Sequence, residues 1–359
     1  MTERCASLLS RRAALLGLGT SVGAGFGTRA RAWTGGRGRR TLTVSGFHGP
    51  FQKAFEATII TPFEHANPGV TVVYRPVLNS AQLLAMLRLE RDASEIDIAI
   101  ADISIAILAT AEGLTAPLTD ADVPNRAALH DWARDPGMNG LAFSRDNLAL
   151  IHDRRTLPPP TSWMDLGRPE LVDQVSMPVQ DTRGVALLPV LTRMAGGDYR
   201  QGIEPGLALM RRFAPNVASW NAQPDIYTLV LAQTVALGVG WNGRGQMIGR
   251  ESPGTIGATI PKEGSVAQIN TLNLTAGSTA GDLGRAFIDH ALSAPAQQAF
   301  AAWAYYGPTN RNATLPDTLS HAIFGSTETA EREMHIDWAF ISAHYSAWIR
   351  RIQREVISG

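Results

Sequence analysis

Residues 41 to 113 alternate between strand-like and helix-like segments, and this alternation is the strongest constraint on the fold. The β-branched stretch TLTVSGF precedes apolar residues at helical spacing, and VTVVYRPV precedes SAQLLAMLRLERD. The third pair, EIDIAIADIS and SIAILATAEGL, begins with a nearly continuous apolar run. Such a run is typical of a strand in a parallel sheet with helices on both faces. The alternation therefore predicts an α/β fold with a mostly parallel sheet.

The middle of the chain continues this pattern with shorter segments. LAFSRDNLALIHDR is interpreted as a pair of strands around a polar turn, and TVALGVGW as a further strand. GATIPKEGSVAQINTLNL is interpreted as two strands, and the segments after it as mostly helical. With 359 residues, the chain is long enough for two domains that each bury a core.

The first 32 residues have the composition of an export signal. The pair Arg11–Arg12 precedes an apolar run rich in Gly and Ala, and the sequence ARA ending at Ala32 fits a cleavage site between small residues. The arginine pair after Ser10 resembles a twin-arginine signal, with an ordinary secretory signal as the alternative. We therefore expect an exported, periplasmic protein and exclude residues 1–32 from the fold.

Charge and cysteine content argue against several classes of function. The chain has 32 basic and 32 acidic residues, and the N-terminal segment holds five of the basic ones but a single acid. The residues after position 32 are slightly acidic overall, so they lack the excess of basic charge that nucleic-acid binding requires. The only cysteine, Cys5, lies in the predicted signal, so the exported chain has no thiol for a disulfide, a zinc site or an iron–sulfur cluster. We expect no cofactor.

The stretch LGVGWNGRG contains Gly238, Gly240 and Gly243 at the G-x-G-x-x-G spacing of dinucleotide-binding loops. That motif requires a helix directly after the loop, because the helix N-terminus binds the pyrophosphate. The residues that follow, RGQMIGRESPGTIG, contain four more glycines and a proline. We expect no three-turn helix from this composition and on that ground reject the nucleotide interpretation.

A set of motifs in a fixed order resembles the extracellular solute-binding proteins of ABC importers, in particular the spermidine/putrescine-type cluster. GVGWNGRG, IPKEGSVAQINTLNL and FAAWAYYGPTNRNA correspond to its Trp-Asn-Gly, Pro-Lys-Glu-Gly and Tyr/Pro/Asn segments. Earlier in the chain, ITPFEHANPGVTV, DIAIADISIAILATAEGLTAPL and PPPTSWMDLGRPELVDQVSMP resemble further segments of this family. The resemblance covers residues 42–320.

This resemblance implies two α/β lobes that are joined by hinge strands and close around a ligand. We expect residues 42–145 and 261–310 to form lobe 1, residues 146–260 to form lobe 2, and residues 311–359 to pack on the lobes as C-terminal helices. The implied function is the capture of a small polar organic solute and its delivery to the membrane subunits of an ABC permease. We expect a monomer with no nucleic-acid partner.

Candidate ligand-binding residues lie where strands end, because loops at the carboxyl ends of strands line such clefts. Trp241 and Asn242 follow one strand: the indole stacks on a ligand or holds a cation, and the amide forms hydrogen bonds. The alternative is that Trp241 is a core residue. Phe47 and His48 end the first strand, and the alternative for His48 is an ordinary turn residue.

Two further strand ends carry charged candidates. Asp102 and Ser104 follow the third strand, and Asp102 either pairs with a ligand amine or caps the next helix. Asp181, Thr182 and Arg183 follow the first strand of lobe 2. The resemblance implies that Asp181 binds a ligand amine. Arg183 either grips a carboxylate or phosphonate or forms a surface ion pair.

The strand after Pro-Lys-Glu-Gly departs from the polyamine-binding pattern. Where that cluster places an aromatic residue and then an acid, this sequence has Gln268 and Asn270. Neutral amides supply no carboxylate for an ammonium group, which puts polyamine specificity in doubt, although both positions are still expected in the cleft. Tyr306 corresponds to the family's tyrosine near the last cleft loop.

The sequence shows no catalytic constellation. After residue 32 there is neither an H-E-x-x-H zinc motif nor a G-x-S-x-G nucleophile elbow. We therefore expect a binding protein without a metal site, and an exported enzyme on the same scaffold or a ligand sensor for a membrane receptor are the alternatives. The ligand class stays open among amines, amino acid derivatives, opine-like compounds and phosphonates.

Overall fold

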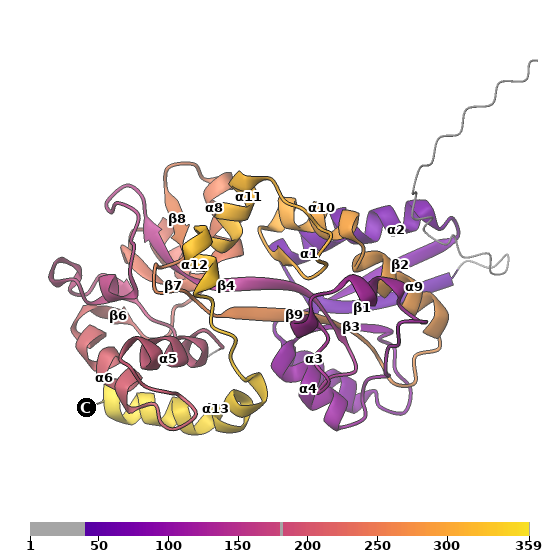
Figure 1. Ribbon diagram of the computed structural model, residues 1–359, viewed down its shortest axis with the longest axis horizontal. Coiled ribbons are helices and arrows are strands. Elements are labelled where there is room, and N and C mark those ends of the chain that lie inside the picture. The colour runs from indigo at the N-terminus through magenta and orange to yellow at the C-terminus, as the bar shows by residue number, and fades with distance from the viewer. Residues whose placement is uncertain (1–39, 180–181, 359) are drawn as a thin grey trace, which may run out of the picture. The chain divides into compact units, whose positions relative to one another are not determined.

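The described chain begins with strands and helices in strict alternation. The structure is a computed structural model, and it describes residues 40–179 and 182–358. The elements of this first part are β1 (Arg40–Phe47), α1 (Pro50–Phe55), the π-helix η1 (Glu56–Ile60), α2 (Thr61–Ala66), β2 (Val70–Val77), α3 (Ser80–Leu89), β3 (Ile98–Asp102) and α4 (Ile103–Ala111). Strand β1 pairs in parallel with β2 and β3, and helices lie on both sides of these strands (Figure 1). Leu42, Val44 and Ile98 are accordingly fully buried.

A second group of strands repeats this arrangement. Its elements are β5 (Val175–Ser176), α5 (Thr182–Met194), α6 (Glu204–Phe213), β6 (Val217–Ser219), α7 (Ile226–Leu231), β7 (Leu237–Trp241), α8 (Asn242–Glu251) and β8 (Ile256–Thr259). Strand β5 pairs in parallel with both β6 and β7. Within the described ranges, five short 3-10 helices connect the other elements: η2 (Pro124–Ala128), η3 (Asp131–Ala133), η4 (Trp163–Gly167), η5 (Pro169–Leu171) and η6 (Ala214–Asn216).

Two antiparallel strands, β4 (Leu141–Asp153) and β9 (Ala267–Leu274), join the two groups (Figure 1). The first half of β4 pairs with β9, and its second half pairs with β7 and β8. Strand β9 pairs in turn with β3. The result is a ten-stranded sheet with the order β2-β1-β3-β9-β4-β7-β5-β6, in which β8 and β10 (Gly307–Pro308) also pair with β4.

The interpretation of residues 141–154 as two strands around a turn is wrong, because β4 is one continuous strand of 13 residues. The polar run that suggested a turn lies where β4 exchanges one pairing partner for another. Its side chains have partners in other elements: Arg145 pairs with Glu333 and the amide of Asn147 donates to the carbonyl of Ile323. Tertiary contacts of this kind explain polar residues in the middle of a buried strand.

Helices complete the chain after β9. They are α9 (Gly281–Ala291), α10 (Ala294–Ala304), α11 (Asp317–Phe324), α12 (Thr327–Glu331), α13 (Trp338–Ile352) and the π-helix η7 (Gln353–Ile357). Phe300 of α10 packs on Phe143 of β4 and on Phe55, with ring centroids 4.8 and 6.3 Å apart, which fixes α10 on the first strand group. The expected α/β fold, with sheets flanked by helices, is confirmed. The expected crossing near residue 145 falls where β4 changes partners, and the exact lobe boundaries stay a prediction.

Candidate functional site

Residues from strand ends, from β4 and β9, from helices α7 and α8 and from the segment after α10 form one polar cluster, which we call the crossing cluster. It consists of Asp102, Asp146, Tyr227, Trp241, Arg244, Gln268 and Tyr306. Asp102, Asp146 and Arg244 lie close enough to Tyr306 for their charges to act on its hydroxyl. Tyr227 contacts Trp241, since its hydroxyl donates to the Trp241 carbonyl at 2.9 Å and accepts from the Trp241 N–H at 2.7 Å. The structure thus brings together four of the residues expected from the sequence: Asp102, Gln268 and Tyr306 through their side chains, and Trp241 through its backbone.

Asp102 is placed as the N-cap residue of α4, but its side chain does not cap the helix. Its carboxylate instead accepts a hydrogen bond from the Gln268 amide of β9, and its backbone N–H donates to the hydroxyl of Ser80 at 2.9 Å. The capping alternative for Asp102 is therefore wrong. Burial raises the pKa of Asp102 to about 6, and the bonds from Gln268 and Ser80 limit this rise.

Asp146 is the residue of the cluster that the sequence did not reveal. It lies on β4 directly opposite Gln268 of β9, and it is 3% exposed. Its Oδ1 accepts a hydrogen bond of 2.8 Å from the Gly243 N–H, and the Tyr306 hydroxyl lies close enough to the same buried carboxylate to stabilise its ionised form. Burial raises the pKa of Asp146 to about 8. An acid between apolar strand residues was the available signal, but the neighbouring Ser, Arg and Asn made the segment look like a turn.

The expectation of no helix after Gly243 is also wrong. Helix α8 begins directly after Trp241 and runs for 10 residues, with Gly243, Gly245 and Gly249 inside it. A Cβ atom on Gly243 would lie 2.9 Å from the Ala304 carbonyl oxygen and from the Tyr306 ring, so glycine permits α8 to approach α10. The Gly243 N–H near the start of α8, where a phosphate would bind, is bonded to the Asp146 carboxylate. This carboxylate, and not the lack of a helix, argues against nucleotide binding.

The aromatic hydroxyls of the cluster are buried and neutral. Burial raises the pKa of Tyr306, and the negative charge of Asp146 raises it further. Burial also raises the pKa of Tyr227, although the charges of Arg183 and Arg244 act in the opposite direction. Arg244 lies over the Tyr227 ring at 4.8 Å and forms an ion pair of 2.6 Å with Asp225. Both hydroxyls therefore act as hydrogen-bonding groups and not as anions.

Two predicted amides are bonded within the protein. Asn242 is 1% exposed, and its side chain donates to the carbonyls of Ala322 and Ile323, near the end of α11. The side chain of Asn270 is also buried and donates to the Ser144 hydroxyl at 3.2 Å. In this structure Asn242 therefore holds α11 against α8, and Asn270 holds β9 against β4.

The other predicted residues lie around the crossing cluster. Phe47 packs edge-on against Phe51, whose ring in turn contacts Tyr306, while His48 is exposed. Ser104 is partly buried in the first turn of α4, and Thr182 and Arg183 begin α5. Asp181 lies outside the described residues.

Two motifs of the resemblance pack on each other instead of on the cluster. The Ser162 hydroxyl, at the start of η4, donates to the Glu263 carboxylate at 2.5 Å, and the Trp163 indole N–H donates to the Gly264 carbonyl at 2.9 Å. The segments TSWMDL and PKEG are therefore a structural contact that fixes the chain just before β9.

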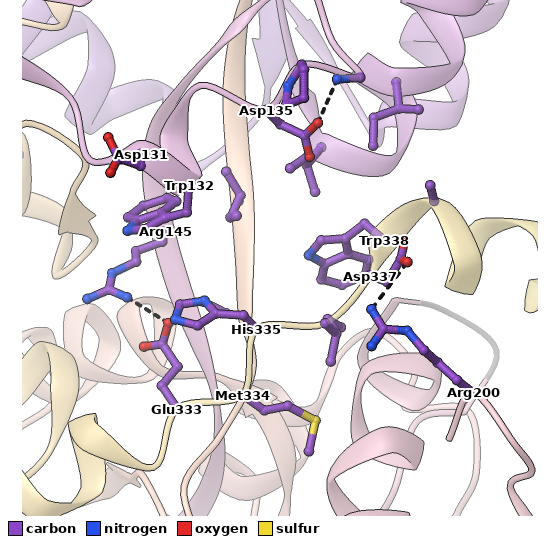
Figure 2. Close-up of a pocket in the computed structure, with 18 residues that line it drawn as sticks. Asp131, Trp132, Asp135, Arg145, Arg200, Glu333, Met334, His335, Asp337 and Trp338 are labelled. Atoms are coloured by element: carbon purple, nitrogen blue, oxygen red, sulfur yellow. Dashed lines mark hydrogen bonds and ion pairs between the residues drawn. The ribbon is translucent and has the colours of Figure 1, made fainter. Parts of the chain in front are cut away.

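A cavity of about 500 Å³ lies on the opposite face of β9 from Gln268. Ala267 and Ile269 line it, whereas Gln268 between them points to Asp102, as expected for consecutive strand residues. Figure 2 shows Arg145 and Glu333 pointing toward each other beside Trp132, with His335 next to them. The Arg145–Glu333 and Arg200–Asp337 ion pairs measure 2.6 and 3.3 Å. None of the residues predicted for the ligand site lines this cavity.

No helix in the described ranges 40–179 and 182–358 is long and apolar enough to cross a membrane. No curated protein matches the sequence significantly. Solved structures with the same fold include an ABC transporter substrate-binding protein from Bradyrhizobium japonicum USDA 110, at 17% identity and a TM-score of 0.75, covering 88% of this chain and 99% of that one.

Two further structures of this fold are of binding proteins for named solutes. One is the spermidine/putrescine ABC transporter substrate-binding protein of Streptococcus pneumoniae, at 18% identity and a TM-score of 0.71, covering 88% of this chain and 99% of that one. The other is the binding protein MotA from A. tumefaciens B6 in complex with glucopine, at 17% identity and a TM-score of 0.71, with coverage of 88% and 99%. These identities support a common fold. The family model for bacterial extracellular solute-binding proteins matches residues 58–323, and the chain belongs to this family.

Proposed function

We propose that this protein is the exported substrate-binding component of an ABC importer. It captures a small polar organic solute between two lobes and delivers it to the permease subunits in the membrane. The lobes are residues 42–145 with 261–310 and residues 146–260, and residues 311–359 pack on them. Its family and the ABC transporter components among its structural neighbours support this role.

The observation that carries the proposal is the crossing cluster itself. It combines acids, amides and aromatic hydroxyls at strand ends and at the strand pair β4–β9, the connection between the two strand groups. Ligands of open α/β folds bind outside the carboxyl ends of strands. A solute that contacts residues from both strand groups is bound best when the groups are close together, which couples binding to lobe closure.

The mixture of groups favours a ligand with an amine or amide. Asp102 and Asp146 offer carboxylates, and Trp241 offers an aromatic face for stacking or for a cation. Amines, amino acid derivatives and opine-like compounds satisfy these groups, and a phosphonate is disfavoured beside two acids. The protein acts as a monomer in this proposal.

A thermal-shift screen tests the function. The purified chain is heated with amines, amino acids, opines and phosphonates, and each compound is analysed afterwards by mass spectrometry. A ligand at 100 times its Kd adds about 2.7 kcal/mol of stability and raises the Tm. Recovery of the bound compound unchanged supports a binding protein. Its conversion would establish the enzyme alternative, and no stabilisation by any class of compound would refute the proposal.

A further inference from the structure

We propose that the cavity on the other face of the strand pair β4–β9 is a second ligand site, which takes an uncharged molecule with a flat apolar ring. The occupant of this site changes how readily the two lobes close. The site is separate from the crossing cluster, and only its regulatory effect rests on the proposed function.

The strand pair β4–β9 separates this cavity from the crossing cluster. Ile269 of β9 lies directly opposite Arg145 of β4, and both residues line the cavity. The neighbouring opposed pair, Gln268 and Asp146, belongs to the crossing cluster. Opposed residues share one face of a sheet, and consecutive residues of a strand lie on opposite faces. A molecule in the cavity and a solute at the crossing cluster therefore have the strand pair between them.

The walls of the cavity come from both strand groups. Ile103 and Ile107 of α4 belong to the first group, and Arg200, in the loop before α6, belongs to the second. Residues 333–337, between α12 and α13, also line the cavity, and α13 contacts both α4 and α5. An occupant therefore gains or loses contacts when the two groups move. A molecule with unequal affinity for two arrangements shifts the population between them.

The segment between α12 and α13 gives the cavity a wall that is fixed in place. The Met334 N–H donates to the Ser265 carbonyl just before β9 at 2.7 Å, and the Asp337 N–H donates to the Tyr199 hydroxyl at 2.9 Å. Trp338, the first residue of α13, is buried. A site whose walls are already ordered loses little conformational entropy when a ligand binds.

The shape and surface of the cavity favour a ring compound. Its volume of about 500 Å³ is in the range of small-molecule sites. Four isoleucines and two tryptophans supply its apolar surface: Ile103, Ile107, Ile269, Ile336, Trp132 and Trp338. Figure 2 shows Trp132 beside Arg145 and Trp338 beside Asp337. Aromatic rings pack favourably against indole edges and aliphatic side chains.

The charged groups around the cavity already neutralise one another, which favours an uncharged ligand. The ion pairs are Arg145–Glu333, Arg200–Asp337 and Arg134–Asp131. Asp135 accepts a hydrogen bond of 2.7 Å from the Gly137 N–H, and His335 is exposed to solvent. A charged ligand would lose its hydration here and compete with existing ion pairs for a partner. A neutral ring needs no such partner.

Calorimetric titration with three biphenyl compounds tests the site. The neutral probe is 4-phenylphenol, and its charged counterparts are 4-phenylbenzoate and 4-phenylbenzylamine. We expect 4-phenylphenol to bind with a stoichiometry of one, and each charged compound to bind about 10-fold more weakly or less.

Variants on α4 locate the bound probe. Ile107→Asp places a carboxylate in the apolar wall, and we expect it to weaken 4-phenylphenol binding about 10-fold. Leu108→Asp is the matched control, because Leu108 is the next residue of the same helix, is 38% exposed and does not line the cavity. The melting temperature shows whether Ile107→Asp is folded, and Ile336→Asp repeats the test from the opposite wall.

Fluorescence transfer between the strand groups tests the regulatory effect. Cys5→Ser removes the only cysteine of the chain. Leu89→Cys and Val172→Cys then add one exposed labelling site to each group. We expect saturating 4-phenylphenol to change the transfer efficiency in this labelled protein, and to have no effect at the same concentration once Ile107→Asp is added.

The outcomes separate this inference from the proposed function. Absence of saturable 4-phenylphenol binding, equal weakening in Leu108→Asp, or an unchanged transfer efficiency at saturation would overturn the inference and leave the proposed function intact. A solute from the thermal-shift screen whose Kd changes with 4-phenylphenol, without displacement, supports the inference. Direct competition between the two would overturn it, because the cavity would then be the solute site. Absence of any solute in that screen refutes the proposed function alone.

Discussion

Replacing Asp146 by Asn is expected to stabilise the ligand-free protein, and more so as the pH rises. Burial raises the pKa of the Asp146 carboxyl from 3.8 to about 8 in the folded state. The folded protein therefore holds a proton that the unfolded chain loses above pH 4, and stability falls as the pH rises from about 4 to about 8. Below pH 4 the carboxyl is protonated in both states and this effect disappears.

The magnitude follows from the size of this pKa shift. At pH 7 the carboxyl of Asp146 is mostly protonated in the folded state. This pH lies about three units above the pKa of the same carboxyl in the unfolded chain, and the difference corresponds to about 4 kcal/mol. The bond from the Gly243 N–H is already part of this pKa, and the gain is reduced instead because the NH2 group of the new Asn side chain is buried and needs an acceptor. We therefore expect Asp146→Asn to gain about 2–4 kcal/mol at pH 7, or a Tm about 3–6 °C higher for a chain of this length.

Urea unfolding at pH 5, 7 and 8, followed by circular dichroism without ligand, measures the effect. The difference between Asp146→Asn and the wild type should grow steadily over this range, from about 1–2 kcal/mol at pH 5. Asp97→Asn controls for the loss of a buried carboxylate outside the crossing cluster. A constant difference at all three pH values, or a less stable Asp146→Asn at pH 8, would contradict the argument that Asp146 is an uncompensated buried acid.

Four further predictions concern the crossing cluster and its surroundings. Binding of an amine at pH 7 should release up to one proton, because Asp146 must ionise to pair with it. Asp102, with its pKa of about 6, is already mostly charged at this pH, and the two buried tyrosines stay neutral. The release is measured as a dependence of the binding heat on the ionisation enthalpy of the buffer. Asn242→Ala should lower stability by about 1–3 kcal/mol in chemical unfolding, since two carbonyls near the end of α11 lose their donor. Glu333→Gln should cost about 2–3 kcal/mol by the same assay, because it leaves Arg145 mostly buried without its charge partner, with the exposed Glu328→Gln as the control. Gly243→Ala should lower the Tm by several degrees, since its Cβ would lie 2.9 Å from the Ala304 carbonyl, whereas an unchanged Tm would show that α8 and α10 can separate at little cost.

The strand ends of the crossing cluster could be predicted because local patterns determine them. The apolar run before Asp102 and the one before Trp241 both end at a polar or aromatic residue, and these two strand ends meet at the crossing pair, Asp102 opposite Asn270 of β9 and Trp241 opposite Leu148 of β4. Gln268 could be predicted as a cleft residue because it follows the Pro-Lys-Glu-Gly segment at the sequence spacing of the family motif. Its bond to Asp102, 166 residues away in the chain, was beyond the reach of any local pattern.

The two errors in secondary structure have a common physical cause. Polar residues in β4 and glycines in α8 are unfavourable by local propensity, and a single stretch of sequence carries no information about distant partners. In the folded chain the polar residues of β4 have distant partners, and the glycines of α8 permit contacts that a Cβ would prevent. Both exceptions lie at the crossing cluster, where the sequence departs from local preference because residues from distant segments meet there.

The two errors also concealed a second acidic group in the cluster. Along β9 alone, Gln268 and Asn270 describe a neutral site, and that reading puts an amine ligand in doubt. In an antiparallel pair, however, the side chain opposite a given residue lies on the same face of the sheet and about 5 Å away, so either strand can supply the carboxylate. Asp146 of β4 supplies this carboxyl group here, and the Gly243 N–H of α8 donates to its Oδ1. In the proposed function we therefore expect the strand pair β4–β9 to contribute to specificity, and because that pair also joins the two strand groups, we expect a ligand held by it to act directly on the connection that moves when the lobes close.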